Sequence, residues 1–248
     1  MQKILGFIAI FILLAGFIGT NHVLAAEHNE ENKVGENEAS ELFSSFMDKV
    51  FNDEDKLIVL DSSGSDITNE FIDTTDEYYK SGDYQKIQSI IKDKNLSISY
   101  GEKSYMDNAE VKEYMNEAEV NENMSDDNDL NAVIGIDDSR EFYHIATDTS
   151  GRFTKEWTVT LSGSYLYNTI TKQSYSLTGP VVDLTVANFG ASFSPYLSNI
   201  STSNSTDPLA TFTANYTMEA DLSIPIGDIP VGVTFDFGDY TDTLTSVP

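Results

Sequence analysis

Strict alternation of apolar and polar residues identifies the C-terminal half of the chain as a region of β-strands. From 211 to 224 every second residue is apolar, and the positions between them carry Thr, Asn, Glu, Asp or Ser. A similar period of two occurs at 157–167, 181–189 and 231–237. In a strand this period gives one buried face and one solvated face. We therefore predict an antiparallel β-sandwich domain over residues 132–248.

Three turns are predicted within this region, one of them bracketed by Pro225 and Pro230. Apolar residues at 133–136 and 142–145 flank the polar run Asp137–Arg140, a pattern typical of a hairpin. Gly179–Pro180 indicates a second turn, because this dipeptide commonly interrupts regular structure.

Helical periodicity replaces the alternation between residues 39 and 100. Apolar residues recur at spacings of three and four along 42–51, and weaker stripes follow at 71–79 and 84–91. The run Leu57–Leu60 fits either a strand or a turn of helix, and residues 96–100 alternate like a short strand. This stretch predicts a small, mainly helical region.

The expected fold is therefore α+β, with the helical and strand regions in separate parts of the chain. We expect an acidic flexible leader at 26–38, the mainly helical region at 39–100, an acidic linker at 101–131 and the β-sandwich at 132–248.

The first 25 residues have the order of a secretory signal peptide. Lys3 precedes an apolar run from Ile4 to Ile18, and small residues follow, which predicts cleavage after Ala25 or after Ala26. The apolar run is shorter than the roughly 20 residues that a membrane-spanning helix needs. We therefore expect a secreted, extracellular protein with no transmembrane segment in the mature chain.

Charge narrows the range of partners. The formal net charge is −27, and residues 27–150 hold 32 acidic and 10 basic residues, against 9 and 3 in residues 151–248. Such a chain is repelled by nucleic acid, so we expect no nucleic-acid partner. An unidentified protein or carbohydrate partner is expected instead. The chain has no Cys, which excludes thiolate chemistry and favours a bacterial source. Its use of Lys, Asn and Ile favours a Gram-positive bacterium.

Catalytic residues are hard to find in this sequence. Outside the signal peptide the histidines are His28, in the leader, and His144, which we interpret as an exposed or edge strand residue. Neither belongs to a recognisable catalytic motif, so the chain is predicted to be non-enzymatic and to need no cofactor. The acidic cluster Asp236, Asp239 and Asp242 is interpreted as a solvated turn.

Calcium is the one metal that the sequence brings into consideration. The candidate ligands are oxygen donors at positions 1, 3, 5 and 12 of a twelve-residue loop: Asp127, Asp129, Asn131 and Asp138. This loop departs from an EF-hand because Ala132 replaces the glycine at position 6 and because position 12 is Asp.

Three function hypotheses follow. The first is a secreted, non-enzymatic binding protein that acts through its C-terminal β-sandwich. The alternative is a membrane-active toxin or bacteriocin-like effector with an acidic N-terminal propeptide, since long strands with one apolar and one hydroxyl-bearing face can cross a bilayer. The second alternative is a hydrolase that uses a pair of carboxylates.

Overall fold

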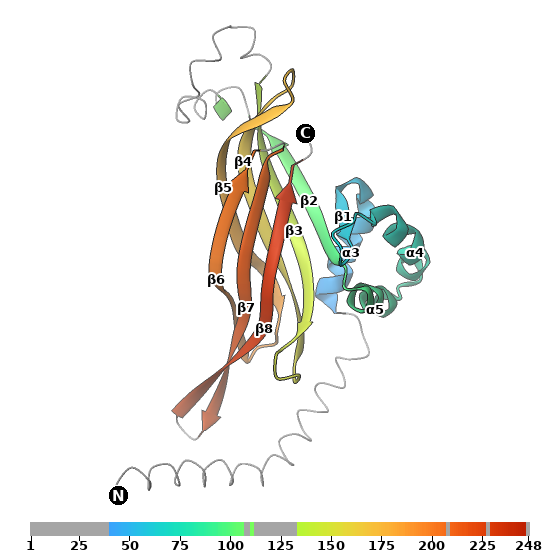
Figure 1. Cartoon of the computed structure of the whole chain (residues 1–248). Helices are drawn as coiled ribbons and strands as arrows, with labels where there is room; N and C mark the ends of the chain where they lie inside the picture. Colours follow the sequence, from blue (N-terminus) through green and yellow to red (C-terminus); the bar gives the residue numbers. More distant parts are fainter. Residues whose placement is uncertain (1–39, 107–109, 112–132, 207–208, 227–228, 247–248) are drawn as a thin grey trace, which may run out of the picture.

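The computed structural model describes residues 40–106, 110–111, 133–206, 209–226 and 229–246. Most of these residues lie in long antiparallel β-strands, and the helices gather on one side of them (Figure 1). The predicted signal peptide, its cleavage site and the acidic leader lie outside the described residues. Among the residues described, no helix combines the length and the apolar character that a membrane span requires.

The helices begin and end where local chemistry favours it. Helix α3 (Glu41–Asn52) begins after Ser40, whose hydroxyl accepts a hydrogen bond from the Phe43 amide at 3.1 Å. Helix α4 (Thr68–Ser81) ends at Gly82, which has a φ of 73°. Helix α5 (Tyr84–Lys94) follows directly. The helical interpretation of residues 39–100 is therefore confirmed for these segments, and Leu57–Leu60 forms strand β1.

The strands form two antiparallel sheets. The five-stranded sheet has the order β1-β2-β3-β4-β5, and the three-stranded sheet has the order β6-β7-β8. The remaining strands are β2 (Ser97–Tyr105), β3 (Val133–Thr147), β4 (Thr154–Asn168), β5 (Gln173–Asn188), β6 (Phe193–Ser205), β7 (Thr211–Ile226) and β8 (Ile229–Thr245). The strands predicted from alternation at 157–167 and 211–224 are thus confirmed as β4 and β7.

One apolar core lies between the two sheets. Its members come from both sheets, because alternation turns every second side chain of β3, β4, β7 and β8 inward. Trp157, Tyr165 and Phe212 are among its largest fully buried side chains. Gly163 makes room for this packing, since a Cβ there would fall 2.5 Å from the ring of Phe212.

A second core joins the helices to the opposite face of the five-stranded sheet. The ring of Tyr143 in β3 lies 5.1 Å from that of Phe43 and 5.5 Å from that of Phe46, both in α3. Strand β2 pairs with β3 from Ile98↔Tyr143 to Tyr105↔Ile136. The predicted linker at 101–131 therefore begins inside a strand, and the sheet continues across the predicted domain boundary.

The turns predicted at 137–140 and at 179–180 are wrong, whereas β7 and β8 pair antiparallel on either side of the turn predicted between Pro225 and Pro230. Residues 137–140 continue strand β3, because their side chains find partners on both faces of the sheet. Asp137 accepts a hydrogen bond from Ser164 at 2.6 Å, and the buried Asp138 accepts one from Ser246 at 2.6 Å. Gly179–Pro180 lies inside β5, close to a register irregularity between β4 and β5.

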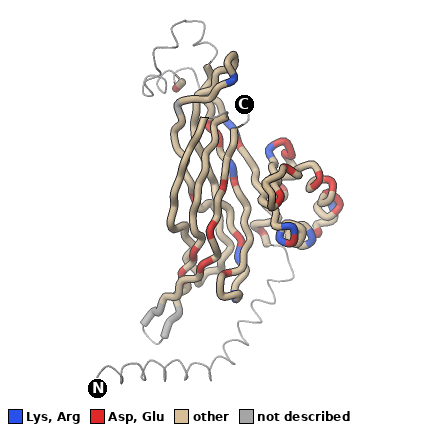
Figure 2. The backbone as a smooth tube through the Cα atoms, in the orientation of Figure 1, with Lys and Arg blue, Asp and Glu red and all other residues tan. Residues whose placement is uncertain are grey.

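Charge is distributed unevenly over these elements. Figure 2 shows basic positions interspersed with acidic ones on the helices, whereas the strands carry acidic positions and few basic ones. An acidic surface around the strands disfavours anionic partners there.

Candidate functional site

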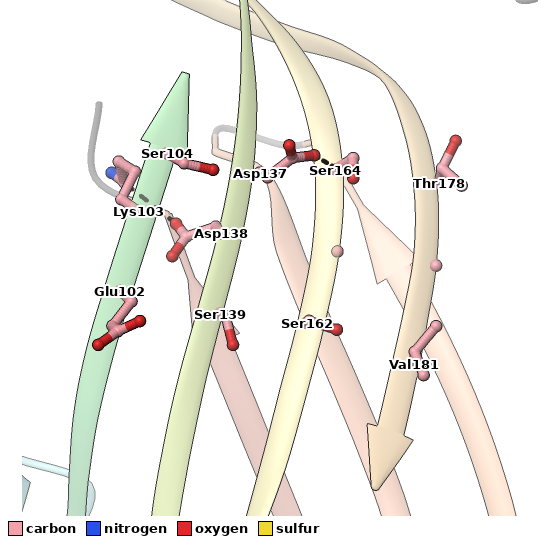
Figure 3. A pocket seen from close by; sticks show the side chains of 12 residues that line it. Glu102, Lys103, Ser104, Asp137, Asp138, Ser139, Ser162, Ser164, Thr178 and Val181 are labelled. Carbon is pink, nitrogen blue, oxygen red and sulfur yellow. Dashed lines mark hydrogen bonds and ion pairs between the residues drawn. The ribbon is translucent and has the colours of Figure 1, made fainter. Parts of the chain in front are cut away.

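An open groove of about 420 Å³ lies on the five-stranded sheet (Figure 3). Four neighbouring strands, β2 to β5, contribute to it, and nine of its twelve lining residues have polar side chains. The lining residues are Glu102, Lys103, Ser104, Asp137, Asp138, Ser139, Ser162, Gly163, Ser164, Thr178, Gly179 and Val181.

The groove occupies the part of the outer sheet face that the helices leave uncovered. Asp137 and Ser139 alternate in phase with Tyr143, which contacts helix α3, so all three belong to one face of β3. Ser162 and Ser164 pair across from Ser139 and Asp137 in the next strand. Because these side chains stand on paired strands, their spacing is fixed by the sheet.

Hydroxyl groups and carboxylates make up most of the polar lining. Ser164 Oγ donates to Asp137 Oδ1 at 2.6 Å, as the dashed line in Figure 3 shows. Glu102 and Asp137 are exposed to solvent. Lys103 is the one basic residue of the lining, and its Nζ lies 3.8 Å from Asp138 Oδ2. The groove therefore offers many hydrogen-bond acceptors and disfavours anions.

Asp138 turns to the other side of the sheet and fixes the C-terminal segment. Its Oδ2 accepts from Ser246, whose hydroxyl also bonds to the phenol of Tyr165. Burial raises the pKa of Tyr165 to about 12, so this phenol keeps its proton at neutral pH. Asp138 is thus held in a buried hydrogen-bond chain below the groove.

The calcium hypothesis is not supported by Asp138, which lies in the middle of β3 and not at the end of a loop. Asp127, Asp129 and Asn131 lie outside the described residues, so the calcium site stays a prediction. Within the described ranges, no group of three or more acidic or histidine side chains is placed to hold a metal ion.

His144 lies between the two sheets, in a cluster of polar and aromatic side chains. Its Nε2 is 3.1 Å from Asp242 Oδ2 and 3.0 Å from the hydroxyl oxygen of Tyr216. Tyr216 donates to the same Asp242 oxygen at 2.6 Å. The imidazole stacks on Trp157 with centroids 5.6 Å apart, and the ring of Tyr240 meets it at 4.8 Å. We call these five residues the His144 cluster.

This cluster corrects two interpretations of the sequence. The His144 side chain is only 12% exposed and the Asp242 side chain 3%, so neither is a solvated residue. Burial and the nearby Asp242 raise the pKa of Tyr216, which keeps that hydroxyl a donor. Asp236 and Asp239 are exposed, but they belong to strand β8 and not to a turn. The cluster therefore connects β3 of one sheet to β7 and β8 of the other.

Sequence reasoning missed the groove. Its residues were divided among different predicted features, with 102–104 in the acidic linker, 137–139 and 179 in turns, and 162–164 in a strand. Their convergence depends on β2 pairing with β3, although residues 106–132 separate these strands in sequence. No local signal in the chain indicates that pairing.

Comparison with known proteins gives no relative: no protein-family model, no curated protein and no solved structure matches this chain. The geometry of the groove is therefore the basis for interpreting function.

Proposed function

We propose that the protein is a secreted, non-enzymatic bacterial binding protein that holds a neutral, hydroxyl-rich ligand in the groove of its β-sandwich. The observation that carries this proposal is the groove itself, with five hydroxyl-bearing side chains and two exposed carboxylates on four paired strands. Carboxylates and hydroxyls can each accept hydrogen bonds from the hydroxyl groups of a carbohydrate. A ligand of this kind avoids the repulsion that an anionic polymer would meet at a protein with a net charge of −27.

The N-terminal region supports the groove directly. Glu102 and Ser104 of β2 form one wall, and β2 is held by β1 and β3. Removal of residues 26–131 as a propeptide would take this wall away. We therefore propose that the working molecule includes both the helices and the strands, and that it acts in the extracellular space of a Gram-positive organism.

A screen of neutral oligosaccharides and uncharged peptides against the mature chain tests the proposal. We expect binding of at least one neutral oligosaccharide, and an approximately tenfold loss of affinity in Ser139→Leu, because the new side chain removes a hydroxyl and narrows the groove. Isothermal titration calorimetry measures both affinities.

Ser203→Leu is the matched control, since Ser203 is an exposed strand residue on the three-stranded sheet. It should leave the affinity unchanged. A ligand whose affinity falls equally in both variants, or is unaffected by Ser139→Leu, would bind elsewhere and would contradict the assignment to the groove.

Membrane activity is a second candidate, favoured by the end of the β7–β8 pair. The last pair between β6 and β7 is Phe193↔Leu222, whereas β7 and β8 stay paired from Ser223↔Gly232 to Ile226↔Ile229. Residues 224–226 and 229–231 of this two-stranded extension are Ile, Pro or Val. Figure 1 shows the extension projecting past the other strands.

Dye release from zwitterionic liposomes tests this second candidate. A membrane-active protein should release dye at micromolar concentrations of the mature chain, and less from anionic liposomes because of its negative charge. Full dye retention with both lipid compositions would remove the candidate.

A further inference from the structure

Arg140 has an unusual setting for a strongly acidic protein. It is one of two arginines in a chain with 41 acidic residues. It lies in β3 opposite Gly101 of β2. Its guanidinium rests against that glycine, because a Cβ at position 101 would fall 2.5 Å from Nη2 and 2.9 Å from Cζ. The missing side chain at 101 therefore creates the seat in which the guanidinium lies.

Among the described residues, only one of the three guanidinium nitrogens has hydrogen-bond acceptors. Arg140 Nη1 donates to Ser99 Oγ at 3.3 Å, to the Ser99 carbonyl at 3.5 Å and to the Lys56 carbonyl at 3.4 Å. In the part of the chain that the structure describes, Nε and Nη2 have no hydrogen-bond acceptor. Neither of the two atoms is fully buried. These two nitrogens form the edge of arginine that accommodates both oxygens of a carboxylate.

Among the described residues, no carboxylate forms an ion pair with Arg140. The carboxylate whose charge affects the pKa of Arg140 is Asp138, which accepts a hydrogen bond from Ser246 and lies near Lys103. Burial lowers the pKa of Arg140, and an arginine nevertheless remains charged at neutral pH. A half-buried cation without an anion is unfavourable, and an added anion relieves that cost.

We propose that Arg140 binds a carboxylate, which accepts hydrogen bonds from Nε and Nη2 at once. The seat on Gly101 and the bonds of Nη1 hold the guanidinium in place, so little side-chain entropy is lost on binding. A singly charged carboxylate suits this position better than a phosphate dianion, because the net charge of −27 opposes every additional negative charge. The carboxylate can belong to a small molecule or to an acidic side chain of a peptide, and the site is separate from the groove.

Nuclear magnetic resonance of the side-chain Nε–H groups tests the proposal in the mature chain. Two arginines give two such signals, and Arg152→Lys assigns them. We expect the Arg140 signal to shift saturably with acetate, and at lower concentration with a short Glu-containing peptide if the natural ligand is a peptide. The signal of the exposed Arg152 should shift weakly and without saturation.

Arg140→Lys keeps the charge but loses the two-nitrogen edge, so we expect about tenfold weaker acetate binding, followed by chemical shifts of the amides near Ser99. Arg152→Lys should bind like the wild type, and thermal unfolding shows whether each variant is folded. Equal, unsaturable shifts of both arginines, no shift of Arg140, or tighter binding of inorganic phosphate than of acetate would each overturn the proposal.

Discussion

Asp242→Ala is expected to destabilise the folded protein by about 1–3 kcal/mol, because it removes the buried acceptor of Tyr216 and leaves that hydroxyl with His144 as its partner. Asp242 Oδ2 is the shared acceptor of Tyr216 and the neighbour of His144 Nε2, at 2.6 and 3.1 Å. Both partners are enclosed between the sheets and have little access to water. Urea unfolding followed by far-ultraviolet circular dichroism measures the loss as a lower midpoint at an unchanged slope.

Asp183→Ala is the matched control for this experiment. It removes the same charge from an exposed position of strand β5, so its effect should stay within about 0.5 kcal/mol. A triple variant, Asp242→Leu with His144→Leu and Tyr216→Phe, should recover part of the loss, since the three hydrogen-bonding groups then disappear together. Equal effects of Asp242→Ala and Asp183→Ala would show that the His144 cluster does not stabilise the sheet packing.

Trp157→Ala is expected to cost about 3–5 kcal/mol through the cavity that it leaves in the main core. Trp157 is fully buried and contacts aromatic rings from both sheets, with centroid distances of 5.3 Å to Tyr240, 6.0 Å to Phe189 and 6.2 Å to Phe237. For a chain of this size, the loss corresponds to a fall in Tm of about 6–20 °C. Trp157 is the only tryptophan, so circular dichroism must follow the melting.

Trp157→Phe keeps an aromatic ring in the same place and should lose much less stability. In the wild type, tryptophan emission should be that of a buried indole and should shift to longer wavelength on unfolding. A Trp157→Ala variant that melts like the wild type would contradict the position of Trp157 in the shared core.

The regular elements were largely predictable, because local periodicity reports which face of an element is buried. The unbroken alternation around Tyr216 and Met218 predicted strand β7, and the stripe containing Phe43 and Phe46 predicted helix α3. The same logic failed at Asp137–Arg140. Four consecutive polar residues resemble a turn until the tertiary structure supplies Ser164 and Ser246 as partners on opposite faces.

The candidate sites were not predictable for a related reason. Glu102 and Asp137 meet in the groove, and His144 meets Asp242, only because strands distant in sequence are neighbours or face one another. Alternation gives the two faces of each strand but not the order of strands in a sheet or the pairing of two sheets. Composition by itself determined the strong negative charge and the absence of cysteine. Only the tertiary structure decided which polar residues are buried, because burial of a polar group depends on a partner that the local sequence does not contain.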